Sequence, residues 1–195
     1  MIIVWNVRGA AGNAFGHAMK DMKKRLKPSL VVLVETRCSG INAQKAIKRM
    51  GFKYQEIVEA NGMSGGIWIL WDDENIKLKA LEKHHQFLHC EVNGLRGSKW
   101  LFTAIYASPR AAERQLLWES LKSMSRNING PWLLAGDFND IKTPEEQRGG
   151  IKVNERKCNK FCSNMNDCNL IDMGTEGPKY TWKGPIVHLG ISICT

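Results

Sequence analysis

The sequence predicts an α/β protein, because short apolar runs typical of buried strands alternate with segments in which apolar residues recur at helical spacing. Residues 30–34 and 132–135 are continuous apolar runs, as expected of strands covered on both faces. Leu117, Leu121 and Met124 repeat at the interval of an amphipathic helix. With 195 residues, 43% of them hydrophobic and 24% charged, the chain has the size and composition of one globular domain, or of one domain with a piece missing.

The N-terminal half of the sequence reads as strand, helix, strand and helix, followed by a β-rich region. Pro28 ends the first helix, and Gly51 closes the second. Strict alternation over residues 76–81 indicates a half-exposed strand, and Asn93-Gly94 indicates a hairpin. In chain order, strands are expected at 1–5, 30–34, 52–59, 67–71, 76–81, 86–92 and 99–106, and helices at 15–27 and 43–50.

The C-terminal half begins with a helix at 111–128 and the strand at 132–135, which runs into Gly136, where glycine permits a tight bend. A polar loop then leads to a helix that carries Cys158 and Cys162 one turn apart. We expect these cysteines to be small apolar residues on the buried face of that helix. The six cysteines form no paired CxxC units, so neither disulfides nor a structural zinc site is predicted.

The net charge of +9 favours a polyanionic partner, chiefly nucleic acid, without establishing one. The basic residues are dispersed except for one cluster on the first predicted helix, which is also explained as the solvated face of that helix: Lys20, Lys23, Lys24, Arg25 and Lys27. No apolar run is long enough to span a bilayer, so no membrane partner is expected. The N-terminus reads as a strand rather than a leader, and we expect an intracellular monomer.

Polar residues stand at or just past the ends of the predicted strands: Asn6, Glu35, Tyr106, Asp137 and Asn139. Such residues can converge on one rim of a two-layered sheet fold, where sites are common. Strand alternation predicts that Asp137 and Asn139, two positions apart, point the same way. A carboxylate and an amide held there can orient a phosphate or a metal-bound water, although a turn that only stops the strand explains the same spacing.

An ordered set of motifs gives these residues a family context: WNVRG at 5–9, VETR at 34–37, SGGIWILW at 64–71, YASP at 106–109, GDFND at 136–140 and YTW at 180–182. In order and spacing the set resembles the endonuclease/exonuclease/phosphatase superfamily. With Arg8 in the first motif, it is most similar to the endonuclease domain of non-LTR retrotransposons. The resemblance covers residues 1–182 as an incomplete domain and leaves 183–195 as a divergent tail.

The resemblance implies a four-layered α/β sandwich, in which two mainly antiparallel sheets face each other with helices outside. It also implies a metal-dependent phosphodiesterase that nicks DNA, is nuclear if functional, and uses Mg²⁺, with Mn²⁺ as an alternative. Glu35 would be the principal metal ligand, and Asn6 would hold the metal-ligand network or a phosphate oxygen. By the same resemblance, Tyr106 would bind the scissile phosphate, Asp137 would orient the attacking water, and Asn139 would bind a phosphate oxygen in the transition state.

Two segments of the family pattern have no counterpart in the sequence: an LDR-like segment and a terminal SDH motif with its catalytic Asp and His. Val187-His188-Leu189 faintly resembles the stretch before SDH, and His188 is also explained as an ordinary tail residue. The resemblance therefore implies that C-terminal strands are missing and that nicking is impaired. Loss of one positioned acid or base typically costs about 10²–10⁴ in rate.

Two other functions remain open at this point. The first is a non-catalytic nucleic-acid-binding remnant that uses the +9 charge. The second is a phosphatase of small molecules or lipids on the same fold, against which Arg8 and the basic composition argue. Arg8 also stands where DNA-repair members of the superfamily usually have an Asp, which disfavours a repair role.

Overall fold

The computed structural model of the chain describes residues 1–94, 97–149, 153–174, 176–177, 180, 182–183 and 193–194. Two features singled out in the sequence, Thr181 in the last motif and the stretch 187–189, lie outside these residues. The chain divides into two compact units, one made of residues 1–113 and 129–137 and the other of residues 114–128 and 138–195.

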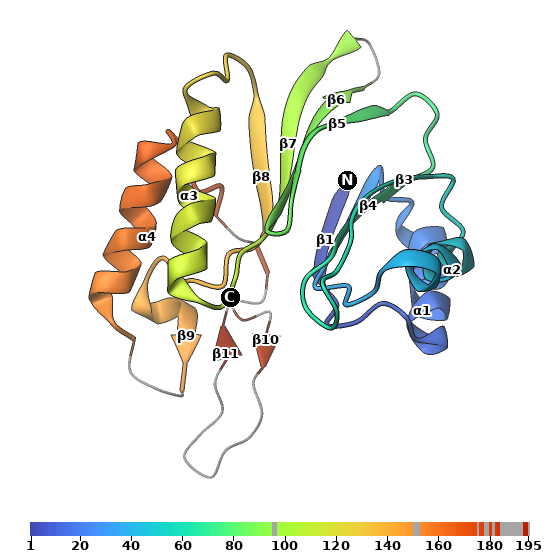
Figure 1. The fold of residues 1–195 in the computed structure, drawn as a ribbon, viewed down its shortest axis with the longest axis horizontal. Coiled ribbons are helices and arrows are strands. Elements are labelled where there is room, and N and C mark those ends of the chain that lie inside the picture. Colours follow the sequence, from blue (N-terminus) through green and yellow to red (C-terminus); the bar gives the residue numbers. More distant parts are fainter. Residues whose placement is uncertain are drawn as a thin grey trace. The chain divides into compact units, whose positions relative to one another are not determined.

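The first unit contains two four-stranded sheets. The sheet formed by the N-terminal strands has the order β1-β2-β4-β3, in which only β1 and β2 run parallel. Figure 1 shows these strands in blue and cyan. Their bounds are β1 Ile2–Asn6, β2 Leu30–Val34, β3 Tyr54–Val58 and β4 Ile67–Trp71.

The second sheet of this unit has the order β5-β6-β7-β8, in which only β7 and β8 run parallel. Both sheets are therefore mainly antiparallel, as predicted. The bounds are β5 Lys77–His84, β6 Phe87–Asn93, β7 Lys99–Tyr106 and β8 Trp132–Asp137. Because a parallel pair aligns the same ends of its strands, each sheet carries one edge where two carboxyl-terminal ends meet.

The core of the first unit lies between the two sheets. Alternate residues of β2 and β4 on one side, and of β6 and β7 on the other, are almost fully buried in one cluster, which includes Val32, Ile69, Leu88 and Phe102. The opposite face of the first sheet packs against two helices, α1 (Asn13–Leu26) and α2 (Gly40–Met50). Figure 1 shows both helices on that outer side. Burial of β2 and β4 on both faces explains their continuous apolar sequences.

The second unit contains most of α3 (Ala111–Ser125), a 3₁₀ turn η2 (Pro144–Glu146) and α4 (Glu155–Asp167). Trp118, Phe138 and Phe161 pack against one another with ring centroids 5.6–5.8 Å apart. A small antiparallel sheet has the order β10-β11-β9 and joins three short strands: β9 Gln147–Arg148, β10 Trp182–Lys183 and β11 Ile193–Cys194.

The structure confirms the predicted α/β fold, with helix and strand ends displaced by a few residues. Cys158 is buried on α4 as expected, whereas Cys162 is only half-buried, and the five cysteines whose side chains are described form no disulfide. Within the described part of the chain, no helix combines the length and apolar character needed to cross a bilayer.

Two predictions for β8 are wrong. The strand is only half-buried along its length because it forms the edge of its sheet, whereas its apolar sequence predicted cover on both faces. Gly136 does not bend the chain after the strand but lies inside it, paired with Ile105. Glycine is needed there because an added Cβ would lie 1.9 Å from the carbonyl oxygen of Ile105, and because φ is +155°.

We therefore expect Gly136→Ala to lower the free energy of unfolding by more than about 1 kcal/mol, because the native conformation is incompatible with a side chain. Chemical denaturation of the purified chain measures this change. Gly130→Ala is the matched control, since nothing lies within 4 Å of its added Cβ, and it should change stability by no more than about 0.5 kcal/mol. Equal effects of the two substitutions would contradict the assigned role of Gly136.

Candidate active site

The two parallel strand pairs bring four of the five predicted site residues to strand ends of the first unit. Asn6 is the last residue of β1, and Glu35 directly follows β2, its parallel partner. Tyr106 and Asp137 end β7 and β8 and stand opposite each other in the register of that pair. The topology of each sheet thus accounts for one pair of site residues.

A hydrogen bond joins the two pairs across the sheets. Nδ2 of the Asn6 side chain donates to Oδ2 of Asp137 at 2.6 Å. Oδ1 of the same side chain accepts from the backbone N–H of Arg8 at 3.2 Å. The second contact fixes the rotation of the amide and leaves its N–H₂ group toward the carboxylate. The ends of β1 and β8 therefore meet at one place.

The carboxylate of Glu35 is buried and held by two arginines. Its Oε1 accepts from Nε of Arg37 at 3.1 Å and also from Nη2 of the same guanidinium. Its Oε2 lies 3.9 Å from Nε of Arg8. A buried carboxylate without such partners would be strongly unfavourable, so the guanidinium groups offset the cost of burying Glu35.

The loops that follow β1, β2 and β3 hold this arrangement through backbone hydrogen bonds. The N–H of Gly9 donates to the carbonyl of Glu35 at 2.9 Å, and the N–H of Arg37 donates to the carbonyl of Gly65 at 2.9 Å. Arg8, Glu35 and Arg37 all have positive φ, between 47° and 56°. Strained backbone of this kind clusters at functional sites and persists only where surrounding structure fixes it.

The hydroxyl of Tyr106 shares the same environment. Burial raises the pKa of Tyr106 to about 12, and the negative charges of Glu35 and Asp137 act in the same direction, while Arg37 and Arg8 act against it. These four charged groups therefore surround one phenol. In this environment the hydroxyl stays protonated at neutral pH and is able to donate a hydrogen bond.

Asn139, the fifth predicted residue, belongs to the second unit. Strand β8 ends at Asp137, and Asn139 has a φ of +47°. The alternation on which their common direction was predicted does not extend to Asn139, because the strand ends at Asp137. Asparagine is one of the few residues that adopt this left-handed conformation readily.

Arg37 and Gly66 are features of the site to which sequence reasoning assigned no role. Arg37 stands two residues after Glu35 within the VETR motif, and this spacing is the signal that could have identified it. An added Cβ on Gly66 would lie 2.2 Å from Oγ1 of Thr36, which is buried without a hydrogen-bond partner. The double glycine therefore allows the β3–β4 loop to approach the residues that hold Glu35.

The oxygen ligands at this site suit a hard cation. Mg²⁺ keeps several waters and is usually bound by one or two carboxylates together with substrate phosphate, so Glu35 with the oxygen-bearing side chains of Asn6 and Asp137 fits such an ion in ligand type. Across the described residues, no group of three or more His, Cys, Asp or Glu side chains could hold a metal. A cation here would therefore depend on water and phosphate for most of its ligands.

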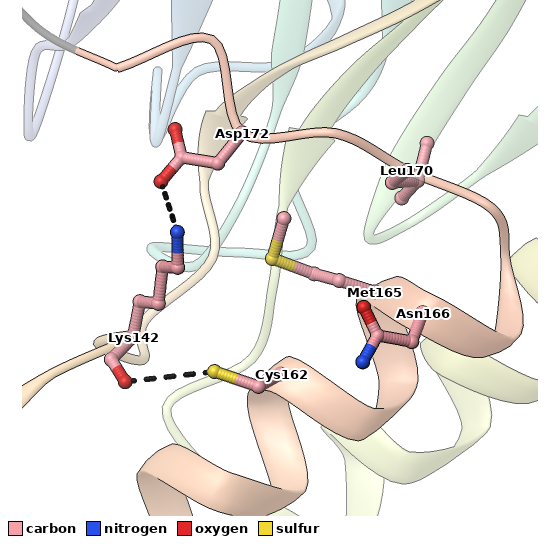
Figure 2. Close-up of a pocket in the computed structure, with 6 residues that line it drawn as sticks. All are labelled: Lys142, Cys162, Met165, Asn166, Leu170 and Asp172. Atoms are coloured by element: carbon pink, nitrogen blue, oxygen red, sulfur yellow. Dashed lines mark hydrogen bonds and ion pairs between the residues drawn. The ribbon is translucent and has the colours of Figure 1, made fainter.

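A separate hollow of about 110 Å³ lies in the second unit (Figure 2). Lys142 forms an ion pair there with Asp172, with Nζ and Oδ2 at 2.9 Å, and its carbonyl accepts from the thiol of Cys162 at 3.6 Å. The remaining lining residues are Met165, Asn166 and Leu170. This hollow contains none of the predicted site residues, and its charged groups are paired with each other.

Comparison with known proteins gives this arrangement a context. Residues 3–164 match the model of the Endonuclease/Exonuclease/phosphatase family. No curated protein matches the chain.

Solved structures share the fold at low sequence identity. An AP endonuclease from Leishmania major has a TM-score of 0.77 at 13% identity, over 100% of this chain and 78% of that one. The endonuclease domain of TRAS1, a telomere-specific non-LTR retrotransposon, has a TM-score of 0.70 at 12% identity, over 100% and 84%. A 3′ phosphatase from Neisseria bound to a product DNA hairpin has a TM-score of 0.68 at 17% identity, over 99% and 86%.

The raised pKa of Tyr106 gives a direct test of the site's electrostatics. In the ultraviolet absorbance titration, the difference between the native protein and Tyr106→Phe should show a midpoint at about pH 12. An unfolded tyrosine loses its proton at about pH 10. The stabilisation of the folded state by the protonated Tyr106 side chain is therefore fully present below that pH and is lost as the pH rises to about 12. A difference midpoint near pH 10 would show that the phenol is neither buried nor close to these carboxylates.

Proposed function

Because the chain belongs to the Endonuclease/Exonuclease/phosphatase family, we propose that it hydrolyses phosphodiester bonds of DNA as a divalent-cation-dependent endonuclease. The observation that carries this proposal is the 2.6 Å hydrogen bond between Asn6 and Asp137, together with the buried carboxylate of Glu35 at the end of the strand paired with β1. An acyl-transfer site would need a nucleophile beside its base, whereas oxygen ligands with a phenol and an amide suit phosphoryl chemistry.

The side chains divide the chemistry among them. Asp137 orients the attacking water and accepts its proton, while the bond from Asn6 holds the carboxylate in place. Protonated Tyr106 donates a hydrogen bond to a non-bridging oxygen of the scissile phosphate. The resemblance also assigns Asn139 to a second phosphate oxygen, a role that stays a prediction because Asn139 belongs to the other compact unit. These contacts stabilise the charge that develops on the phosphate as the water attacks.

Glu35 would be the principal ligand of a Mg²⁺ or Mn²⁺ ion, with Asn6 as a neighbouring oxygen donor. Such an ion, when bound, would neutralise charge on the leaving oxygen. The proposal does not depend on a metal cage made of protein groups alone, since magnesium sites in proteins are commonly completed by water and substrate phosphate.

We also propose a retrotransposon origin for the domain. Its support is Arg8, together with the VETR and GDFND motifs, and the fold shared with the endonuclease domain of TRAS1. For the 195-residue chain assayed alone, the sequence-based hypothesis of impaired nicking predicts a rate about 10²–10⁴ below that of an enzyme with a positioned His–Asp pair.

A second function, nucleic-acid binding without catalysis, is favoured by the charge on α1 and α2. These helices and Lys27 carry eight basic residues and one acidic residue, Asp21: Lys20, Lys23, Lys24, Arg25, Lys27, Lys45, Lys48 and Arg49. Lys20, Lys24 and Lys27 are exposed and recur at helical spacing. A surface of this kind would bind phosphates whether or not the site at the strand ends hydrolyses them.

The endonuclease proposal predicts that the purified chain nicks supercoiled plasmid in the presence of Mg²⁺, and that EDTA stops the reaction. Asp137→Asn should lower the nicking rate about 10²–10⁴-fold, because the amide cannot accept the proton of the water. In Glu35→Gln, the nicking rate should no longer change when Mg²⁺ is added. Gel separation of supercoiled and open-circular DNA measures the rate.

The matched control for both variants is Glu74→Gln, which removes one carboxylate from an exposed ion pair with Lys53. Its nicking rate should equal that of the unmodified chain. Hydrolysis that survives Asp137→Asn and Glu35→Gln unchanged would overturn the assignment of the site.

The binding-only alternative makes a different prediction. The logarithm of its DNA association constant should fall linearly with the logarithm of the salt concentration, and should be unaffected by EDTA or by Glu35→Gln. Replacing Lys20, Lys24 and Lys27 together with alanine should reduce that slope in a fluorescence-anisotropy titration. An unchanged slope would show that this face does not contact DNA.

A further inference from the structure

The carboxylate of Glu35 is enclosed by the two guanidinium groups that hold it. Its side chain is 11% exposed, whereas those of Arg37 and Arg8 are 37% and 51% exposed. Solvent and ligands therefore reach the arginines more readily than the carboxylate. Any cation that binds Glu35 has to share it with Arg37 or displace that side chain.

The backbone keeps both arginines close to Glu35, while their long side chains stay partly exposed to solvent. Gly9 and Arg37 donate hydrogen bonds to the carbonyls of Glu35 and Gly65, each at 2.9 Å. The guanidinium groups can therefore exchange one anionic partner for another without movement of the main chain. A planar guanidinium binds a phosphate as well as it binds a carboxylate.

We propose that Arg8 and Arg37 bind the substrate phosphodiester, and that their transfer from Glu35 to the phosphate makes binding of the phosphodiester and of the divalent cation mutually dependent. This inference rests on the proposed function of the site and adds to it two specificity-determining residues and a form of regulation.

The charges explain the direction of the coupling. A cation that binds Glu35 when no phosphodiester is present lies beside two positive guanidinium groups. The repulsion between these charges weakens binding of the cation. A phosphodiester that binds the guanidinium groups when no cation is present lies beside the buried carboxylate of Glu35. The repulsion between these two anions weakens binding of the phosphate. When both ligands are present, each charge has an opposite neighbour.

Coupling of this kind is reciprocal, so the phosphodiester must strengthen cation binding by the same factor as the cation strengthens phosphodiester binding. Allosteric factors are commonly about 5- to 150-fold. We expect the protein to bind Mn²⁺ weakly by itself and more tightly, by a factor in this range, when a phosphodiester is present.

The test uses dimethyl phosphate, a minimal phosphodiester, and measures free Mn²⁺ by electron paramagnetic resonance during titration of the whole chain. Dimethyl phosphate should tighten Mn²⁺ binding at least about 5-fold, and Glu35→Gln should remove the bound Mn²⁺. In Arg37→Ala, Mn²⁺ should bind more tightly than in the unmodified chain without dimethyl phosphate, and the enhancement by dimethyl phosphate should disappear.

Three further variants separate this mechanism from a general effect of charge. Arg37→Lys keeps the charge but loses the two-pronged contact, so the enhancement should be reduced. Arg8→Ala should reduce it less than Arg37→Ala, because Arg8 lies 3.9 Å from the carboxylate. Lys53→Ala removes one positive charge from an exposed pair with Glu74 and should leave the enhancement unchanged. Thermal unfolding monitors folding, and Arg8→Ala and Arg37→Lys suffice if Arg37→Ala does not fold.

The inference is overturned if dimethyl phosphate does not tighten Mn²⁺ binding, if neither arginine variant reduces the enhancement, or if Lys53→Ala reduces it equally. These results are independent of hydrolysis. Nicking that depends on Glu35, without coupling through the arginines, would leave the proposed function standing alone. Coupling without any nicking would support the role of the arginines and count against the endonuclease activity.

Discussion

The hydrogen bond between Asn6 and Asp137 is the contact on which the site depends. It is 2.6 Å long and joins the end of β1 in one sheet to the end of β8 in the other. Parallel pairing then determines what lies beside each partner, since Glu35 follows the strand next to β1 and Tyr106 ends the strand next to β8. Two parallel pairs in otherwise antiparallel sheets therefore bring four functional groups together.

The second constraint is the negative charge collected at these strand ends. The carboxylates of Glu35 and Asp137 both act on Tyr106, whose pKa rises to about 12 chiefly through burial. Arg8 and Arg37 balance part of that charge. A site with this balance suits an anionic substrate and a cation that arrive together, because either one alone disturbs the pairing already present.

The sequence predicts the architecture well because burial on one or both faces leaves a strong periodic signal, as in β2, whose predicted and observed bounds coincide. It indicates the polar residues at the strand ends because they interrupt that signal, while their roles in catalysis stay predictions. It fails for β8, since edge position depends on the order of strands and not on composition. Periodicity does not describe Asn139 or Arg37, which have positive φ and lie in loops outside the strands.

The most direct test of the account is a double-mutant cycle between Asn6 and Asp137, with the free energy of unfolding as the measured quantity. Asn6→Ala, Asp137→Ala and the double variant are compared with the unmodified chain. If the two side chains meet as described, the double variant should lose less stability than the sum of the single variants, by about 0.5–3 kcal/mol. Strictly additive losses would contradict the account, because they would mean that the strand ends of the two sheets do not converge on one site.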